Sequence, residues 1–379
     1  MNYDICSIII QLLKPSSIKN MRLVSRKMNN IIFDNTKLIL DMNMYTNINN
    51  TFITKYKYNK LTIDHCMTMY LQNITHLTLD KYFNGDINNL PNSITHLTLG
   101  EYFNKSINSL PKNLTHLHIG YNFNHGIDFL PQTLKYLTLG DSFNQEINNL
   151  PNNLIYLKLS NDFNKSVERL PNKLKYLYFG HSFNQEVNNL PNNLLTLFFG
   201  HEFNQSVDNL PKSIINIHFG TKFNKEINKL PTNLTYLSFH YFSEFNKSVD
   251  NLPPNLKHIA FGCSFNKSVN KLPKNITNVN FGWSFNKSVN KLPKKIKLIT
   301  FNNDFNKEID KLPNSITHMS FSVNSKFNRD IHKLPKKIKY IIFGYLFNKK
   351  INNIPKSMIQ IKQIKCINLH DYAYDVLYG

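Results

Sequence analysis

The sequence predicts a mainly β solenoid, because one phrase recurs fourteen times along its 379 residues. The phrase is Phe-Asn, two variable residues, Ile or Val, two more residues, Leu-Pro, and an apolar segment that often ends in Phe-Gly, as in FNQEVNNLPNNLLTLFFG at 183–200. Successive copies are 20 residues apart, with two steps of 22 that insert at 241–244 and 323–326. Repeats this short cannot bury a core alone, so they are expected to stack into one domain of about fourteen 20–22-residue coils.

The second observation is the apolar spacing inside one repeat. With the Phe of Phe-Asn as position 1, apolar residues recur at positions 1, 5, 8, 12, 15 and 17. Positions 15 and 17 are two residues apart, which is typical of a short strand and predicts one at positions 13 to 17. Pro at position 9 has a fixed φ and no N–H, so it favours an extended or turn segment and excludes a helix interior.

Three other positions have a predicted structural role. The position 1 Phe rings are expected to stack coil upon coil into a buried aromatic spine. The position 2 Asn is expected to form an asparagine ladder that satisfies turn backbone groups of its own coil and the next. The position 18 residue is usually Gly, which predicts a turn with positive φ after the strand.

The N-terminal residues 1–34 have a different pattern. Ile8, Ile9, Leu12 and Leu13 fall at helical spacings, and Lys14-Pro15-Ser16-Ser17 provides a stop and an N-cap before a second helical period. We therefore divide the chain into a helical module at 1–34, degenerate cap coils at 35–82, the repeat solenoid at 83–356, and a C-terminal cap and tail at 357–379.

The segment IIIQLLKPSSIKNMRLVSRKMNNII at 8–32 resembles an F-box. That resemblance implies contact with the small Skp-type adaptor of a cullin–RING ubiquitin ligase. The matching apolar positions are Ile10, Leu13, Pro15, Ile18, Leu23 and Val24. The alternative is that these helices simply cap the stack.

From Phe83 to Pro355 the repeats resemble the FNIP family, which is found in social amoebae and in giant viruses that infect amoebae. The family is similar to leucine-rich repeats, and Leu-Pro-x-x-Leu-x-x-Leu-x-Phe follows their strand segment. Proteins that join an F-box to these repeats are known in such viruses. The resemblance implies a ligase subunit acting in the cytoplasm, which would be that of the host cell if the protein is viral.

The chain is strongly basic, with 45 Lys and Arg against 24 Asp and Glu. Residues 81–222 carry 11 basic and 10 acidic residues, whereas 223–356 carry 23 and 7. Such an excess attracts polyanions. Arginines, which usually read phosphates and bases, are few, so we expect the lysines to form a solvated face and nucleic acid not to be a partner.

Cys6, Cys66, Cys263 and Cys366 are far apart and suggest neither a disulfide framework nor a zinc site. The apolar run at 8–10 is too short for a signal peptide or a membrane span, so no membrane association is expected.

Positions 14 and 16 alternate with the buried strand positions and are expected to point outward. In the middle coils they place an aromatic cluster on the exposed sheet, which we take as the candidate substrate-binding surface: Tyr156, Tyr176, Tyr178, Phe198 and His218. Exposed aromatic clusters are typical of protein interfaces, although cross-strand pairing alone would also explain them.

The search for other chemistry gives little. His96, His116 and His118 fall on two neighbouring predicted strands, and three imidazoles can hold a metal ion. No carboxylate or Cys completes such a site, so no metal site is predicted. No catalytic motif or phosphate loop is present, so we expect neither enzymatic activity nor a cofactor.

The sequence therefore favours a substrate-recognition subunit of a cullin–RING ligase that binds its target through the solenoid sheet. Two alternatives stay open. One is a protein-binding scaffold that recruits no ligase, and the other is an electrostatic nucleic-acid binder that uses the basic half at 223–356. The residues at positions 14 and 16 do not identify the substrate.

Overall fold

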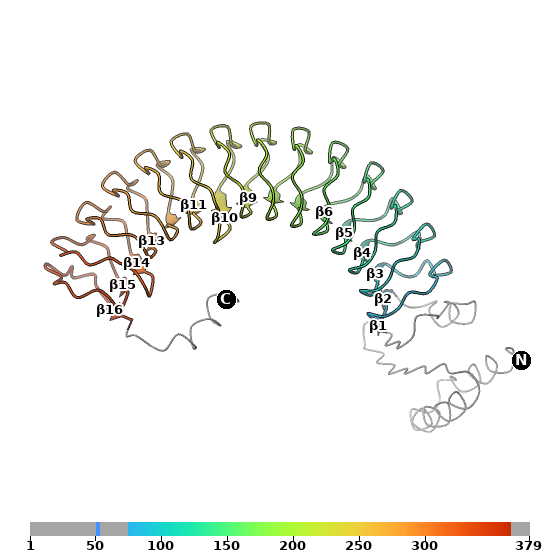
Figure 1. Ribbon diagram of the computed structural model, residues 1–379, viewed down its shortest axis with the longest axis horizontal. Coiled ribbons are helices and arrows are strands. Elements are labelled where there is room, and N and C mark those ends of the chain that lie inside the picture. Colours follow the sequence, from blue (N-terminus) through green and yellow to red (C-terminus); the bar gives the residue numbers. More distant parts are fainter. Residues whose placement is uncertain (1–50, 54–74, 365–379) are drawn as a thin grey trace, which may run out of the picture. The chain divides into compact units, whose positions relative to one another are not determined.

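The computed structural model describes residues 51–53 and 75–364 (Figure 1). The predicted helical module at 1–34, including Ile10, Leu13, Pro15, Ile18, Leu23 and Val24, lies outside the described residues. So do most of the cap at 35–82 and the tail from 365 onward.

The described residues form short parallel strands, one per coil, with no helix among them. They belong to two compact units. The first unit contains β1 (Thr51–Ile53), β2 (His76–Thr78), β3 (His96–Thr98), β4 (His116–His118), β5 (Tyr136–Thr138) and β6 (Tyr156–Lys158). Within this unit each strand pairs with the next one in the chain.

The second unit contains ten strands, which likewise pair in chain order. They are β7 (Tyr176–Tyr178), β8 (Thr196–Phe198), β9 (Asn216–Phe219), β10 (Tyr236–Phe239), β11 (His258–Ala260), β12 (Asn278–Asn280), β13 (Leu298–Phe301), β14 (His318–Phe321), β15 (Tyr340–Phe343) and β16 (Gln360–Gln363).

The predicted strand is confirmed at its centre. Most strands cover positions 14 to 16 or 14 to 17, one or two residues shorter than predicted. Neighbouring strands pair the same position of successive coils, so every position forms a column along the stack, as Leu177 does with Leu197. Columns 15 and 17 are buried from β2 to β15, as the two-residue spacing requires.

The predicted Phe spine is also confirmed. The position 1 rings from Phe83 to Phe327 are 0 or 1 % exposed. Successive rings are nearly parallel in each unit, with centroids 6.3 Å apart for Phe83 and Phe103 and 6.1 Å apart for Phe265 and Phe285. Burial of so much aromatic surface is the main term that holds each coil to its neighbours.

The second unit has an additional aromatic column that the sequence reading did not identify. Its position 17 residue is Phe in each coil from Phe179 to Phe343, whereas the first unit has Leu or Ile there. Phe199 stacks on the spine ring Phe203 at 3.8 Å and on Phe219 of the next coil at 5.4 Å. The core of this unit is therefore a double column of rings.

The predicted asparagine ladder is present. Within each unit the Oδ1 atom of a position 2 Asn accepts the backbone N–H of the Asn in the following coil, at 2.9 Å from Asn104 to Asn84 and 3.0 Å from Asn286 to Asn266. Each side chain thus satisfies a turn donor that the short strands leave unpaired.

The prediction of positive φ at position 18 is wrong. No described Gly has a positive φ, and the one described non-Gly residue that does is Asn353, at 55°. The Gly is needed because coils approach closely there. A Cβ on Gly200 would lie 1.7 Å from the carbonyl oxygen of Gly180, a distance that no side chain can adopt.

The two longer coils keep the spine intact. Each insertion turns a Ser inward, Ser243 in one and Ser325 in the other, and its Oγ accepts the backbone N–H of the following spine Phe at 3.2 Å. Phe223 and Phe245 therefore still stack at 6.1 Å, and the extra residues extend the surface loop alone.

Candidate protein-binding face

The face of the sheet opposite the core carries the side chains of columns 14 and 16. Because columns 15 and 17 point inward, these side chains are partly or fully exposed in most coils. The parallel register places equal positions of successive coils side by side, so like residues form ladders.

Three of the five predicted substrate-binding residues form one continuous ladder in the second unit. The rings of Tyr178 and Phe198 stack with centroids 4.8 Å apart, and those of Phe198 and His218 lie 5.3 Å apart. All three belong to column 16, on β7, β8 and β9. Phe198 is 36 % exposed, although Phe is a residue type that usually lies in a core.

The other two predicted residues lie outside this ladder. Tyr176 is in column 14, where its register partner on β8 is the buried Thr196. Tyr156 belongs to the first unit, and its ring lies 6.2 Å from that of Tyr136 in a tilted arrangement.

The ladder ends at a polar contact. His218 Nδ1 lies 2.8 Å from Ser238 Oγ on β10. Burial, with a smaller effect from His240, lowers the pKa of His218 to about 4, so the ring is neutral at physiological pH. Tyr178, Phe198 and His218 therefore present an uncharged aromatic surface with hydrogen-bonding groups at its margin.

A second ladder lies in column 14 of the first unit. His76, His96 and His116 stack at 3.9 and 4.0 Å, and Tyr136 continues the stack at 4.3 Å. The Nδ1 atom of each His lies 2.9 Å from the hydroxyl of the preceding Thr, which fixes the ring orientation. Burial and the neighbouring His residues lower the pKa of His96 to about 4.

The histidines considered as metal ligands do not converge. His96 and His116 stack in column 14, whereas His118 is in column 16. Among the described residues, the ligand atoms of these three side chains do not lie close enough together to hold one ion. Burial lowers the pKa of His118, and the nearby Lys158 adds to this effect.

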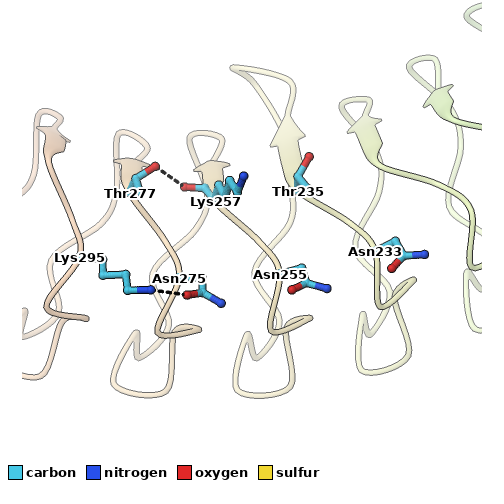
Figure 2. Close-up of a pocket in the computed structure, with 7 residues that line it drawn as sticks. All are labelled: Asn233, Thr235, Asn255, Lys257, Asn275, Thr277 and Lys295. Atoms are coloured by element: carbon cyan, nitrogen blue, oxygen red, sulfur yellow. Dashed lines mark hydrogen bonds between the residues drawn. The ribbon is translucent and has the colours of Figure 1, made fainter.

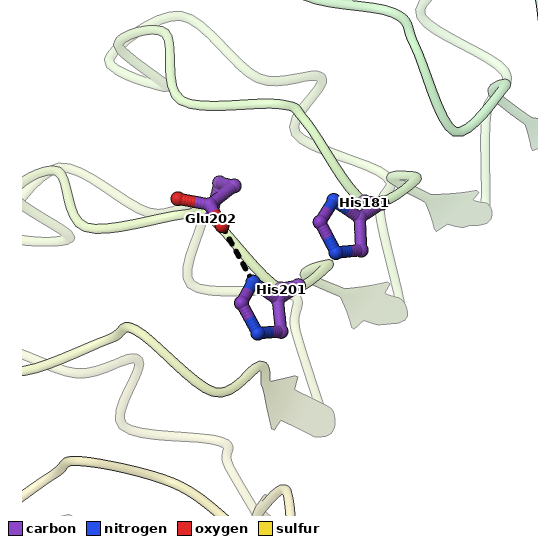
Figure 3. A group of neighbouring side chains, drawn as sticks. All are labelled: His181, His201 and Glu202. Carbon is purple, nitrogen blue, oxygen red and sulfur yellow. Dashed lines mark hydrogen bonds and ion pairs between the residues drawn. The ribbon is translucent and has the colours of Figure 1, made fainter.

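A different cluster has metal-ligating groups close together, at a turn of the second unit (Figure 3). His181 and His201 stack with centroids 4.4 Å apart, and His201 Nδ1 lies 2.7 Å from Glu202 Oε1. One ligand atom from each lies within 4.8 Å of the others. Tetrahedral zinc needs them roughly 3.4 Å apart, so these surface side chains would have to close around an ion. The sequence analysis missed them because, apart from linear motifs, it compared histidines of the strand columns only.

The second unit also has a shallow polar groove beside the strands, with a volume of about 370 Å³ (Figure 2). Asn and Thr side chains alternate along it with Lys257 and Lys295. Asn233, Asn255 and Asn275 are fixed in place because each amide donates to a backbone carbonyl of the preceding coil at 3.0 to 3.1 Å.

These columns of parallel strands, turns and stacked core residues define a leucine-rich-repeat-like solenoid. The FNIP Repeat model matches residues 58–242, in overlapping or adjoining segments, and 288–324. These matches cover more than half of the sequence, and the chain belongs to the FNIP repeat family.

The chain is similar to several solved structures, and the TLR13 complex among them, with a TM-score above 0.5, supports the fold class. The chain is 30 % identical to the one described as "CroV588 a novel circular LRR protein structure", over 83 % of this chain and 62 % of that one, with a TM-score of 0.49. The TLR13–ssRNA13 complex is 14 % identical, with a TM-score of 0.52 over 79 % of this chain and 54 % of that one. An internalin from Listeria monocytogenes is 16 % identical, with a TM-score of 0.47 over 84 % and 87 %.

Three further findings complete the comparisons. No curated protein sequence matches the chain. The matching family is a repeat scaffold, and no catalytic family is indicated. Among the described residues, no helix is long and apolar enough to cross a membrane.

Proposed function

We propose that the solenoid recognises a protein partner on the exposed sheet face of its second unit, through Tyr178, Phe198 and His218. The observation that carries this proposal is the continuous aromatic ladder with Phe198 at its centre, 36 % exposed. Rigid aromatic side chains are typical anchors of protein interfaces because they bury a large area at low entropic cost. Cross-strand stacking alone would stabilise the sheet by up to about 1 kcal/mol per pair, and the experiment below separates the two roles.

In its finer form, the proposal makes the chain a substrate-recognition subunit of a cullin–RING ubiquitin ligase in the cytoplasm. The support is the F-box-like sequence at 8–32, with Ile10, Leu13, Ile18 and Leu23 at the adaptor-contact positions, joined to FNIP repeats. The N-terminal module would bind the Skp-type adaptor while the sheet holds the target. A scaffold that recruits no ligase is the alternative form.

The ligase proposal is tested with purified Skp-type adaptor. Binding is measured for the full chain, for a chain lacking residues 1–34, and for a Leu13→Asp, Ile18→Asp double variant. We expect the adaptor to bind the full chain but neither the truncated chain nor the double variant. The truncated chain lacks the contact residues, and the double variant would bury charged side chains against the adaptor. If the folded full chain does not bind the adaptor, the ligase proposal is wrong and the N-terminal module only caps the repeat stack.

The binding face is tested with a Tyr178→Ser, Phe198→Ser, His218→Gln triple variant. Proteins cross-linked to the wild-type chain in cells are identified by mass spectrometry and compared with those of the variant. Tyr236→Ser is the control, since Tyr236 is an exposed aromatic residue of the same sheet face outside the ladder. Loss of partners with an unchanged melting curve supports the proposal, and retention of every partner contradicts it.

A further inference from the structure

Most lysines of the second unit lie on two different surfaces. One group occupies positions 3 and 7, in the loop after the spine Phe, where acidic residues also lie at positions 4 and 6. Ion pairs form within this loop surface, between Lys229 and Asp208 and between Lys271 and Asp250, each at 3.2 Å. Part of its positive charge is therefore neutralised locally.

The other group lies at positions 10, 11 and 13 of six successive coils, between Thr232 and Lys339, which we call the lysine strip. It contains eight lysines, all exposed: Lys257, Lys274, Lys294, Lys295, Lys297, Lys336, Lys337 and Lys339. None of the six coils has an acidic residue at these positions. None of these lysines forms an ion pair with a described residue.

Backbone hydrogen bonds hold the strip in a fixed register. The position 13 N–H of each coil donates to the position 13 carbonyl of the preceding coil, at 2.7 Å from Lys297 to Thr277 and 2.9 Å from Lys339 to Thr317. Thr and Lys alternate along this column from Thr235 to Lys339. The polar groove runs along the same positions, and its Asn side chains are fixed by backbone carbonyls (Figure 2).

We propose that the lysine strip binds the phosphate backbone of double-stranded nucleic acid without reading its sequence. At the usual spacing of parallel strands the six coils span roughly 24 Å, so the strip offers about one positive charge per 3 Å. A duplex carries one phosphate per about 1.7 Å of its axis, or 3.4 Å for each strand. The charge density of the strip therefore matches that of one duplex strand.

The side chains of the strip disfavour other anionic partners. Its exposed positions carry Lys, Asn, Ser, Thr and Pro254, without an exposed aromatic or large apolar side chain. At these positions the bases of a single strand have no ring to stack on, and a lipid bilayer has no apolar side chain to receive. The exposed Tyr236 and Leu298 that follow the strip residues Thr235 and Lys297 belong to column 14, on the sheet face. Lysine point charges without planar arginine forks are suited to phosphate contact rather than to base readout.

This conclusion departs from the expectation drawn from the sequence, where the scarcity of arginine argued against nucleic acid. Arginine is needed for bidentate base recognition, but the sequence-independent part of binding depends on counterion release by any cation. Which lysines have no carboxylate partner and share one surface is decided by the fold.

The test uses the full chain and a fluorescent duplex of mixed sequence, titrated between about 0.05 and 0.2 M salt. The strip variant replaces Lys257, Lys295, Lys297 and Lys337 by Gln. Its matched control replaces four exposed lysines of positions 3 and 7 by Gln, with the same change of net charge: Lys267, Lys287, Lys291 and Lys311.

Each lost phosphate contact reduces the slope of log K against log salt by about 0.9. Over this fourfold range the wild type is expected to lose roughly 150-fold more affinity than the strip variant. The control should differ from the wild type by less than about fivefold. Equal effects of the two variants would mean that net charge alone matters and would overturn the proposal.

Three further ligands complete the test. Poly-glutamate and anionic lipid vesicles are titrated in parallel with a single strand of the same length. Tighter binding of any of these than of the duplex, or no duplex binding at about 0.15 M salt, would also refute the assignment.

Discussion

Replacing Phe203 by Ala should remove one ring from the centre of the double aromatic column. Phe203 is fully buried and stacks on Phe199 at 3.8 Å, Phe183 at 6.1 Å and Phe223 at 6.0 Å. A buried Phe contributes about 150–250 Å² of apolar surface, or about 4–6 kcal/mol at 25 cal/mol per Å². Since neighbouring rings relax in part, we expect a loss of about 3–5 kcal/mol in the free energy of unfolding.

The matched control is Phe198→Ala, which removes the same kind of side chain from the exposed sheet face, on β8. It should cost less than about 1 kcal/mol, since Phe198 has lost only part of its solvent contact. Urea unfolding followed by circular dichroism measures both, and the urea dependence shows whether the stack unfolds as one unit. Equal costs for Phe203→Ala and Phe198→Ala would refute the assignment of the spine as the dominant source of stability.

Three other predictions follow from contacts between coils. Asn266→Ala should lower the free energy of unfolding by about 1–3 kcal/mol, since the backbone N–H of Asn286 loses its 3.0 Å acceptor. An unchanged urea unfolding curve would contradict a stabilising role of the asparagine ladder. Gly200→Ala should destabilise strongly because its Cβ would lie 1.7 Å from a carbonyl oxygen, whereas Gly126→Ala, with 3.7 Å to its nearest atom, should be tolerated; equal melting temperatures would disprove the steric account. His218 has its folded-state pKa lowered to about 4 by burial, so protonation favours the unfolded state and stability falls as the pH drops from about 6.5 to 4. His218→Gln should reduce this loss of stability at low pH. If the melting temperature of the variant has the same pH dependence as that of the wild type, His218 is not its source.

The arrangement of the second unit separates two potential partners in space. Tyr178, Phe198 and His218 lie in column 16 of the sheet, at the start of the unit, whereas the lysine strip lies at positions 10, 11 and 13 of later coils. The uncharged aromatic surface would bind a protein by burying apolar area in the interface. The lysine strip would bind a polyanion by releasing its counterions. The triple aromatic variant and the four-lysine variant therefore test independent properties of the chain.

Much of the fold could be predicted because the 20-residue period acts on every coil at once. The spacing of apolar residues fixed which positions face the core, and the Phe spine and asparagine ladder follow from chemistry that repeats at positions 1 and 2. The Gly at position 18 was assigned a wrong cause. Its sequence signal is the same for positive φ and for close approach, and only the 1.7 Å distance at Gly200 distinguishes them.

The candidate sites depended more on tertiary structure. The sequence alone determined a solenoid of the FNIP type, its outward columns and its basic second half, because these follow from periodicity and composition. Only the folded chain decided that Phe198 lies between Tyr178 and His218 and that His181 meets His201 at a turn. It also decided which lysines have no carboxylate partner. The physical reason is that a column brings together residues about 20 positions apart, and their contacts depend on strand register and loop geometry, which a one-dimensional pattern does not contain.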